Sequence, residues 1–452
     1  MSQAQHFHAE LAWLGGDAVA TDVLIEVNHG VITSVTTSGL VPDGARRLAG
    51  LTLPGMANTH SHVFHRAIRG RTQSGAADFW AWREQMYKAA DRLDPDNLYA
   101  LATATFAEMA LSGITSVGEF FYVHHGHGGR RYADPNELGA AVVRAANDAG
   151  IRITLLDTCY LQADVGGGPL VGVQQRFDDG SWQEWAERVG QLAETPMVRV
   201  GAAIHSVRAV PREALGPVAE FAESRAMPLH VHLSEQPAEN AACLAQHGLT
   251  PTQLLAEEGV LGPRTTAVHA THLTQTDIEL LGHSATAVSM CCTTERDLAD
   301  GVGPAVQLAR AGSPLCVGSD GHMMIDLFEE ARAIELDERL VTGKRGHLST
   351  QELLTALTVS GAASIGWDAG RIAVGALADF VSVRLDTPRM AGARTGDPLS
   401  HAVFAAGAAD VSTVVVGGRL VVDDGVHLAL PETGLELDRA INAVFDSPGG
   451  GT

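Results

Sequence analysis

The chain alternates short apolar runs with segments of helical pattern, and this alternation limits its fold more than any other feature. Because a helix returns the chain to the same edge of a sheet, strands that alternate with helices form parallel sheets. Eight such units predict a (β/α)8 barrel of the TIM type. A doubly wound open sheet is the rival topology, but no Gly-x-Gly-x-x-Gly fingerprint follows an early run and the sequence has no P-loop. The eight runs are residues 51–62, 114–121, 151–160, 198–206, 229–235, 265–272, 285–294 and 315–322.

Strand patterns also occupy both ends of the chain. Residues 23–27 and 31–35 flank a turn at Asn28, His29 and Gly30, which is a hairpin signal. Similar apolar segments return at 380–383, 414–416 and 420–422. We therefore expect a small β-sandwich domain built from residues 1–52 and 369–446, with the barrel over residues 53–368. The Gly-rich tail at 447–452 is expected to be disordered.

Side chains that can perform chemistry lie at the C-terminal ends of these runs, where barrel enzymes carry their active sites. His60 and His62 are two residues apart, so both rings face the same side of a strand. Three imidazoles and a carboxylate suit a catalytic Zn²⁺ or a related divalent ion. Spacing does not distinguish His232 from His230, whose rings face the same way. The ligands that we assign are His60, His62, His232 and Asp320.

Other residues near these ligands are candidates for proton transfer. Glu235 lies three residues after His232, within reach of a water beside the metal rather than of the metal itself. His269 can serve as a ligand or as a proton shuttle. The run at 198–206 contains no lysine, so a second metal bridged by a modified lysine has no candidate there. We therefore expect one divalent ion per subunit.

Charge and composition restrict the partners of the chain. A net charge of −22 argues against nucleic acid and against anionic membrane surfaces. No apolar stretch approaches the roughly 20 residues that span a bilayer. The five cysteines form no Cys-x-x-Cys pair and the N-terminus has no signal-peptide pattern, so we expect a cytoplasmic protein with free thiols. In so acidic a chain, an anionic substrate requires arginines placed at the site.

Longer motifs surround the candidate residues. The most specific are Phe-Trp-Ala-Trp-Arg-Glu at 79–84 and Tyr-Val-His-His at 122–125, and others lie at 60–67, 205–210, 230–236, 269–272 and 293–295. Together they resemble the amidohydrolase superfamily in its mononuclear deaminase branch, and within that branch the formimidoylglutamate deiminases. The resemblance runs from about residue 10 to about residue 430.

The resemblance implies roles for individual residues. It gives the metal ligands as His60, His62, His232 and Asp320, and it places Glu235, His269 and Asp320 in proton transfer. It also implies a substrate pocket lined by His65, Arg83, Tyr122, His205 and Arg208. The chain departs from its relatives at His65, where they often carry Gln, at Cys292, where they carry Pro, and at 321–324.

The implied reaction is the hydrolytic deimination of N-formimidoyl-L-glutamate to N-formyl-L-glutamate and ammonia, in histidine degradation, by a homodimer. The substrate is a small dianionic amidine, and Arg83 and Arg208 can each bind one carboxylate bidentately. A nucleobase deaminase of the guanine or adenosine type would share the metal ligands without needing two arginines. A binuclear amide hydrolase and a non-catalytic binding protein are the remaining alternatives.

Overall fold

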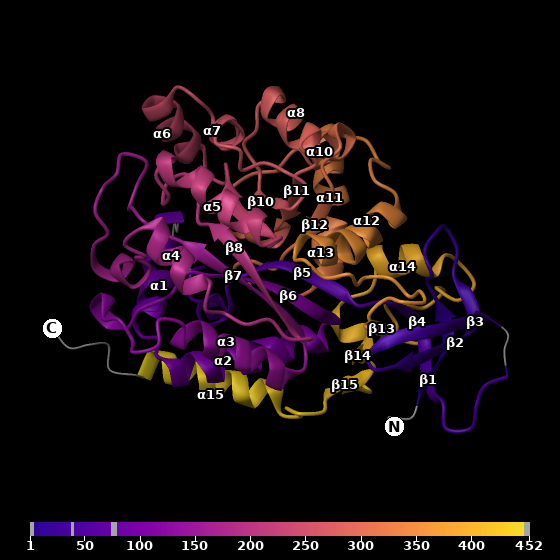
Figure 1. Cartoon of the computed structure of the whole chain (residues 1–452). Coiled ribbons are helices and arrows are strands. Elements are labelled where there is room, and N and C mark those ends of the chain that lie inside the picture. The colour runs from indigo at the N-terminus through magenta and orange to yellow at the C-terminus, as the bar shows by residue number, and fades with distance from the viewer. Residues whose placement is uncertain (1–3, 38–39, 74–78, 447–452) are drawn as a thin grey trace.

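The computed structural model describes residues 4–37, 40–73 and 79–446 and contains two eight-stranded sheets (Figure 1). All strand pairs of one sheet are parallel, in the chain order β5 to β12. Each of the eight predicted runs contains one of these strands, so the predicted barrel is confirmed. The strands are β5 (Met56–Ser61), β6 (Ile114–Phe121), β7 (Arg152–Cys159), β8 (Val198–Ile204), β9 (Leu229–Leu233), β10 (Thr265–His269), β11 (Ala287–Met290) and β12 (Leu315–Val317).

The barrel closes where β12 meets β5. The backbone N–H of Asp320 donates to the His60 carbonyl oxygen (3.0 Å), and Thr59 Oγ1 donates to the Val317 carbonyl oxygen (2.8 Å). A Cβ at Gly318 would lie 2.7 Å from His60 Cβ, so only glycine allows this approach. The closure brings His60 and Asp320, from the two ends of the barrel sequence, to one point.

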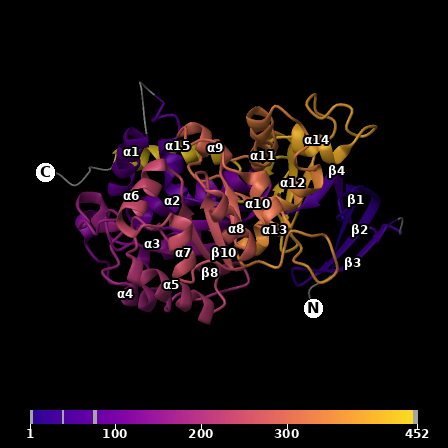
Figure 2. The ribbon, with the colours of Figure 1, turned by 90° about the horizontal axis from the view of Figure 1, so that it is seen from above.

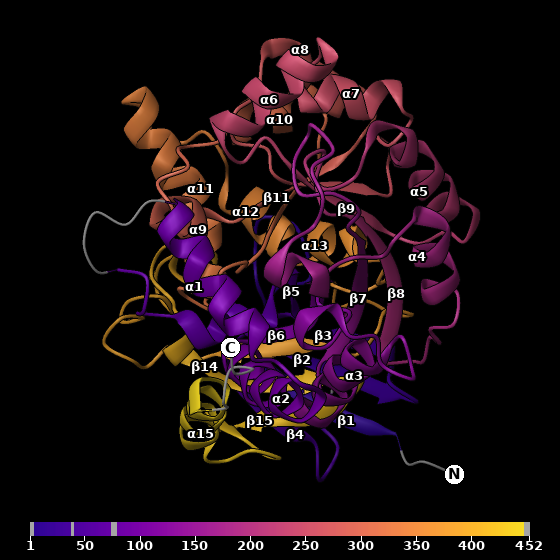
Figure 3. The same ribbon diagram turned by 90° about the vertical axis from the view of Figure 1, so that its left-hand side faces the viewer.

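Helices surround the parallel sheet (Figure 3). The strands are therefore covered on their outer side, and every residue of β6 and β7 is buried. None of the helices that the structure describes has the length and apolar character of a membrane-spanning segment. The helices of this part of the chain are α1 (Phe79–Asp91), α2 (Pro95–Leu111), α3 (Glu137–Ala149), α4 (Trp182–Val189), α5 (Arg212–Ser224), α6 (Pro237–His247), α7 (Pro251–Glu257), α8 (Gln275–His283), α9 (Cys292–Asp297), α10 (Ala305–Ala311), α11 (Leu327–Thr342), α12 (Thr350–Leu357) and α13 (Val359–Ser364).

The second sheet comes from both chain ends, as predicted, and lies beside the barrel (Figure 2). Antiparallel pairing of β4 with β13 joins the two ends, and Phe7, Ile25 and Phe380 belong to a separate core in this sheet. In sheet order its strands are β16 (Val426–His427), β15 (Arg419–Asp423), β14 (Val411–Val416), β13 (Phe380–Val383), β4 (Arg46–Pro54), β1 (Gln5–Ala12), β2 (Ala20–Asn28) and β3 (Val31–Thr37).

The boundary between the barrel and the second sheet is less simple than the sequence pattern indicates. The run at 51–62 crosses between the sheets, because β4 ends at Pro54 and β5 begins at Met56. After α14 (Pro398–Phe404) and the last strands, α15 (Thr433–Asp446) leaves the sheet and lies along α2 of the barrel (Figure 1). The expected disordered tail at 447–452 lies outside the described residues.

A buried ion pair connects the barrel to the second sheet, and its loss should destabilise the fold. Arg152 Nε and Nη2 donate to Asp379 Oδ2 (2.7 Å) and Oδ1 (3.1 Å), and both side chains are almost fully buried. Asp379→Ala leaves a buried guanidinium without its partner, so we expect a loss of about 3–5 kcal/mol in the free energy of unfolding. Urea denaturation measures it. Asp368→Ala, which removes an exposed partner of Arg371, should lose under about 1 kcal/mol, and equal losses would contradict the prediction.

Candidate active site

Four side chains converge at the C-terminal ends of β5, β9 and β12, and they are the four assigned ligands His60, His62, His232 and Asp320. His232 Nε2 lies 3.1 Å from His60 Nε2 and 3.3 Å from His62 Nε2. Asp320 Oδ1 lies 3.3 Å from His60 Nε2 and 3.4 Å from His62 Nε2. Ligands arranged tetrahedrally at about 2.0–2.1 Å from Zn²⁺ are about 3.3 Å apart. The short distances between these donor atoms therefore fit side chains that would share one ion.

The hydrogen bonds of two histidines show why the cluster needs a cation. His62 Nδ1 donates to the Phe120 carbonyl oxygen and His232 Nδ1 donates to the His205 carbonyl oxygen, each at 2.8 Å. A carbonyl can only accept, so these Nδ1 atoms hold the ring protons and both Nε2 atoms carry lone pairs. Burial lowers the pKa of both imidazoles, so they stay neutral. Lone pairs that converge in a buried site repel each other unless a cation lies between them.

Asp320 faces two different groups with its two oxygens. Its Oδ1 faces the histidine cluster, whereas its Oδ2 lies 3.8 Å from His269 Nε2. Burial opposes ionisation of Asp320, but the hydrogen bond from His60 and the neighbouring histidines hold its pKa well below the usual range. Asp320 is therefore a carboxylate that can serve both a metal and a proton transfer.

Carboxylates surround His269. Its Nε2 lies 3.9 Å from Glu235 Oε1, and its Nδ1 lies 3.4 Å from Glu295 Oε1. Burial alone would lower the pKa of His269, but Glu235, Glu295 and Asp320 raise it to about 10. Burial raises the pKa of Glu235, against the opposing effects of His269 and Arg208. A charged imidazole beside an acid with a raised pKa is an arrangement that can move protons.

The backbone at these strand ends is strained. Five residues have φ values in the left-handed region, which residues other than glycine rarely adopt. They are Ser234 (50°), His269 (68°), Ala270 (52°), Asp320 (37°) and His322 (56°). Such residues cost about 1–3 kcal/mol each and gather at functional sites. No sequence pattern predicts this backbone strain.

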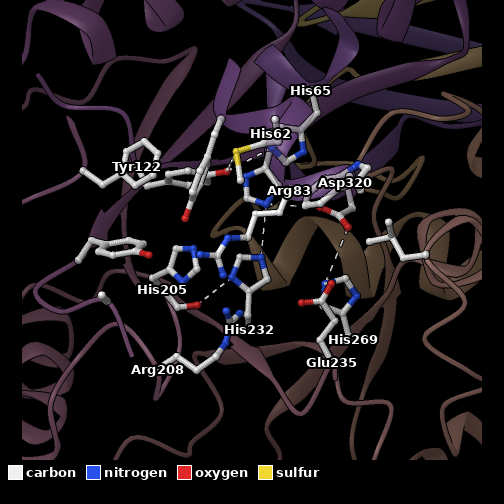
Figure 4. Close-up of a pocket in the computed structure, with 17 residues that line it drawn as sticks. His62, His65, Arg83, Tyr122, His205, Arg208, His232, Glu235, His269 and Asp320 are labelled. Atoms are coloured by element: carbon white, nitrogen blue, oxygen red, sulfur yellow. Dashed lines mark hydrogen bonds and ion pairs between the residues drawn. The ribbon is translucent and has the colours of Figure 1, made fainter. Parts of the chain in front are cut away.

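A cavity opens beside the cluster (Figure 4). Asp320, Glu235 and His269 lie on one side of the view, and Tyr122, His205 and Arg208 lie on the other. The five residues implied to contact substrate all line this cavity; they are His65, Arg83, Tyr122, His205 and Arg208. An aromatic wall completes the cavity, and none of its residues was among the predicted site residues; they are Trp82, Tyr87, Tyr160 and Phe177.

The structure separates the two histidines that spacing left undecided. His230 lies on β9 with His232, but its Nε2 donates to the Ser364 carbonyl oxygen (2.9 Å), outside the cluster. The pocket also contains contacts that spacing could not reveal, such as the one between His65 Nε2 and the Tyr122 hydroxyl (3.2 Å). The Arg83 guanidinium lies 5.0 Å from the centre of the Tyr87 ring.

Comparison with known proteins places this site in a family. The sequence profile of the Amidohydrolase family matches residues 51–421. A Pseudomonas aeruginosa protein named formimidoylglutamate deiminase is 36% identical over 420 residues, which cover 90% of this chain and 92% of the relative. A 5'-deoxyadenosine deaminase of Methanothermobacter thermautotrophicus is 31% identical, covering 91% of each chain. A crystal structure of an amidohydrolase from Brucella melitensis is 30% identical with a TM-score of 0.89, covering 98% of this chain and all of its own. The chain therefore belongs to the amidohydrolase family.

Proposed function

We propose that this protein catalyses the metal-dependent hydrolytic deimination of N-formimidoyl-L-glutamate to N-formyl-L-glutamate and ammonia, in histidine degradation. The observation that carries the proposal is that Arg83 and Arg208 line the same cavity as the histidine cluster. A substrate with two carboxylates needs such residues in a chain with a net charge of −22. The Pseudomonas aeruginosa relative, 36% identical, bears the name of this activity.

The histidine cluster suits Zn²⁺ as the single metal ion. Its donors are three imidazole nitrogens and one carboxylate oxygen, which are ligand types that Zn²⁺ takes in proteins. A divalent ion held there would lower the pKa of a bound water from about 16 toward about 7 and so supply a nucleophile at neutral pH. His60, His62, His232 and Asp320 would hold the ion.

The remaining steps follow from the positions of three protein groups. Asp320 Oδ2 accepts a proton from the attacking water, and the charged His269 Nε2, 3.8 Å away, orients the oxygen. The oxygen adds to the formimidoyl carbon. Glu235 passes a proton to the terminal nitrogen, which leaves as ammonia as its bond to carbon breaks. The carbon–oxygen double bond forms as Glu235 takes up the proton of the new hydroxyl group, and Asp320 releases its proton with the ammonia as ammonium. Arg83 and Arg208 hold the glutamate carboxylates and so fix the formimidoyl carbon beside these groups.

Substrate preference tests this proposal. We expect the zinc-loaded protein to release ammonia from N-formimidoyl-L-glutamate with a kcat/KM about 10³-fold above that for 5'-deoxyadenosine or guanine, because a purine makes neither charge-assisted arginine contact. A coupled ammonia assay measures the rates, and chromatography identifies N-formyl-L-glutamate. N-formimidoylglycine, with one carboxylate, should fall between these substrates. Preference for a purine would instead identify a nucleobase deaminase.

A further inference from the structure

One buried carboxylate outside the reacting groups contacts two parts of the cavity wall. Glu239, the third residue of α6, is 2% exposed. Its Oε2 accepts a hydrogen bond from Arg208 Nε (2.8 Å), and its Oε1 accepts one from the backbone N–H of Ser234 (3.0 Å). Arg208 follows β8, whereas Ser234 follows β9 and immediately precedes Glu235. Glu239 therefore joins the end of one strand to the end of the next.

The first contact determines how Arg208 presents its guanidinium. Because Nε donates to Glu239, the Nη1–Nη2 edge is left for a ligand, and within the described part of the chain no hydrogen bond occupies that edge. The Arg208 side chain lines the cavity and is 29% exposed. A guanidinium held in this way loses less conformational entropy when it binds a carboxylate bidentately.

The second contact holds the strained turn that carries Glu235. Ser234 has a φ of 50°, and both sides of its backbone are hydrogen-bonded: its N–H donates to Glu239, and its carbonyl oxygen accepts from the His272 N–H (3.0 Å). Strain of this kind persists only where the surroundings hold it. The direction of the next side chain, Glu235, depends on that turn.

We propose that Glu239 is a positioning residue that sets both the Arg208 guanidinium for a substrate carboxylate and the Ser234 turn for Glu235. The inference rests on the proposed function, since that function gives Arg208 a carboxylate to bind. A glutamate at the third position of a helix often accepts from a backbone N–H ahead of the helix, as a simple cap. A cap accounts for the Ser234 contact, but it does not account for the pairing with Arg208 in the cavity wall.

Two substitutions at position 239 separate these contacts. In Glu239→Gln the amide oxygen still accepts from Ser234, while its NH₂ group opposes the Arg208 Nε–H. We expect KM for N-formimidoyl-L-glutamate to rise about tenfold with kcat within about twofold of the wild type. Glu239→Ala removes both contacts, so we expect the same rise in KM and a fall in kcat of about tenfold or more.

A double-mutant cycle with Arg208→Ala decides whether the rise in KM passes through Arg208. In that background Glu239→Gln should leave KM unchanged. Glu258→Gln is the matched control, because Arg212 Nε donates to Glu258 Oε1 (2.6 Å) in a similar pair at the surface, and both constants should stay at wild-type values. An unchanged KM in Glu239→Gln, or an equal rise with and without Arg208, would overturn the inference alone. A wild type that does not turn over N-formimidoyl-L-glutamate would overturn the proposed function and the inference with it.

Discussion

Replacing Glu235 with Gln is expected to lower kcat by about 10³-fold while the metal content stays at the wild-type level. Glu235 is 8% exposed, it lines the cavity, and burial raises its pKa, so it can carry the proton that the departing nitrogen needs. Glutamine has nearly the same shape and hydrogen-bonds at the same place, but it cannot release and recover a proton. Steady-state ammonia release measures kcat, and elemental analysis measures the bound metal.

The position of Glu235 makes this test specific. Glu235 does not belong to the histidine cluster, so a fall in kcat with full metal occupancy assigns the loss to proton transfer rather than to metal binding. Glu258→Gln makes the same chemical change at the surface and should retain wild-type turnover. A Glu235→Gln enzyme within about tenfold of the wild-type kcat would remove Glu235 from the proton-transfer step.

The barrel was predictable because its strands are buried on both faces and read as continuous apolar runs. The same property hides the boundary between the sheets. Leu51 and Leu53 of β4 are as fully buried as Met56 of β5, so burial pattern alone does not separate the strands around Pro54. Strand pairing decides the matter, because β4 pairs with β13 across 326 to 332 positions of sequence. Such long-range pairing has no local signal.

The candidate site could be predicted where residues with reactive side chains lie at the ends of predicted strands. It could not be predicted where backbone conformation or tertiary packing determines the direction of a side chain. The spacing of His230 and His232 predicts that both lie on one face of β9. It does not predict the hydrogen bond from His230 to the Ser364 carbonyl oxygen, which separates their roles. Ser234 and Asp320 have positive φ values, which change the directions of the side chains there. Because neither residue is a glycine, the sequence does not indicate this backbone conformation. From the sequence alone, Glu239 is indistinguishable from any glutamate in the first turn of a helix. Its two contacts depend on how α6 packs over the ends of β8 and β9.

Replacing His232 with Asn is expected to reduce bound zinc below about one-tenth of an ion per subunit and turnover by about 10³-fold or more. His232 Nε2 lies within 3.3 Å of both His60 Nε2 and His62 Nε2, so its loss removes one of the four assigned ligand atoms. An asparagine is shorter than histidine and cannot bring a nitrogen lone pair to that point. Elemental analysis after dialysis against a weak chelator measures zinc, and ammonia release measures turnover.

His230→Asn is the matched control, because it makes the same change two residues away on the same face of the same strand. His230 Nε2 donates to the Ser364 carbonyl oxygen, and an asparagine amide retains donor capacity toward it. We therefore expect one zinc ion per subunit and nearly full activity. Loss of zinc from both variants would show that the fold around β9 had failed, and loss from neither would contradict the assignment of His232. Only the difference between the two variants identifies His232 as a ligand, since both positions carry a buried histidine on the same strand.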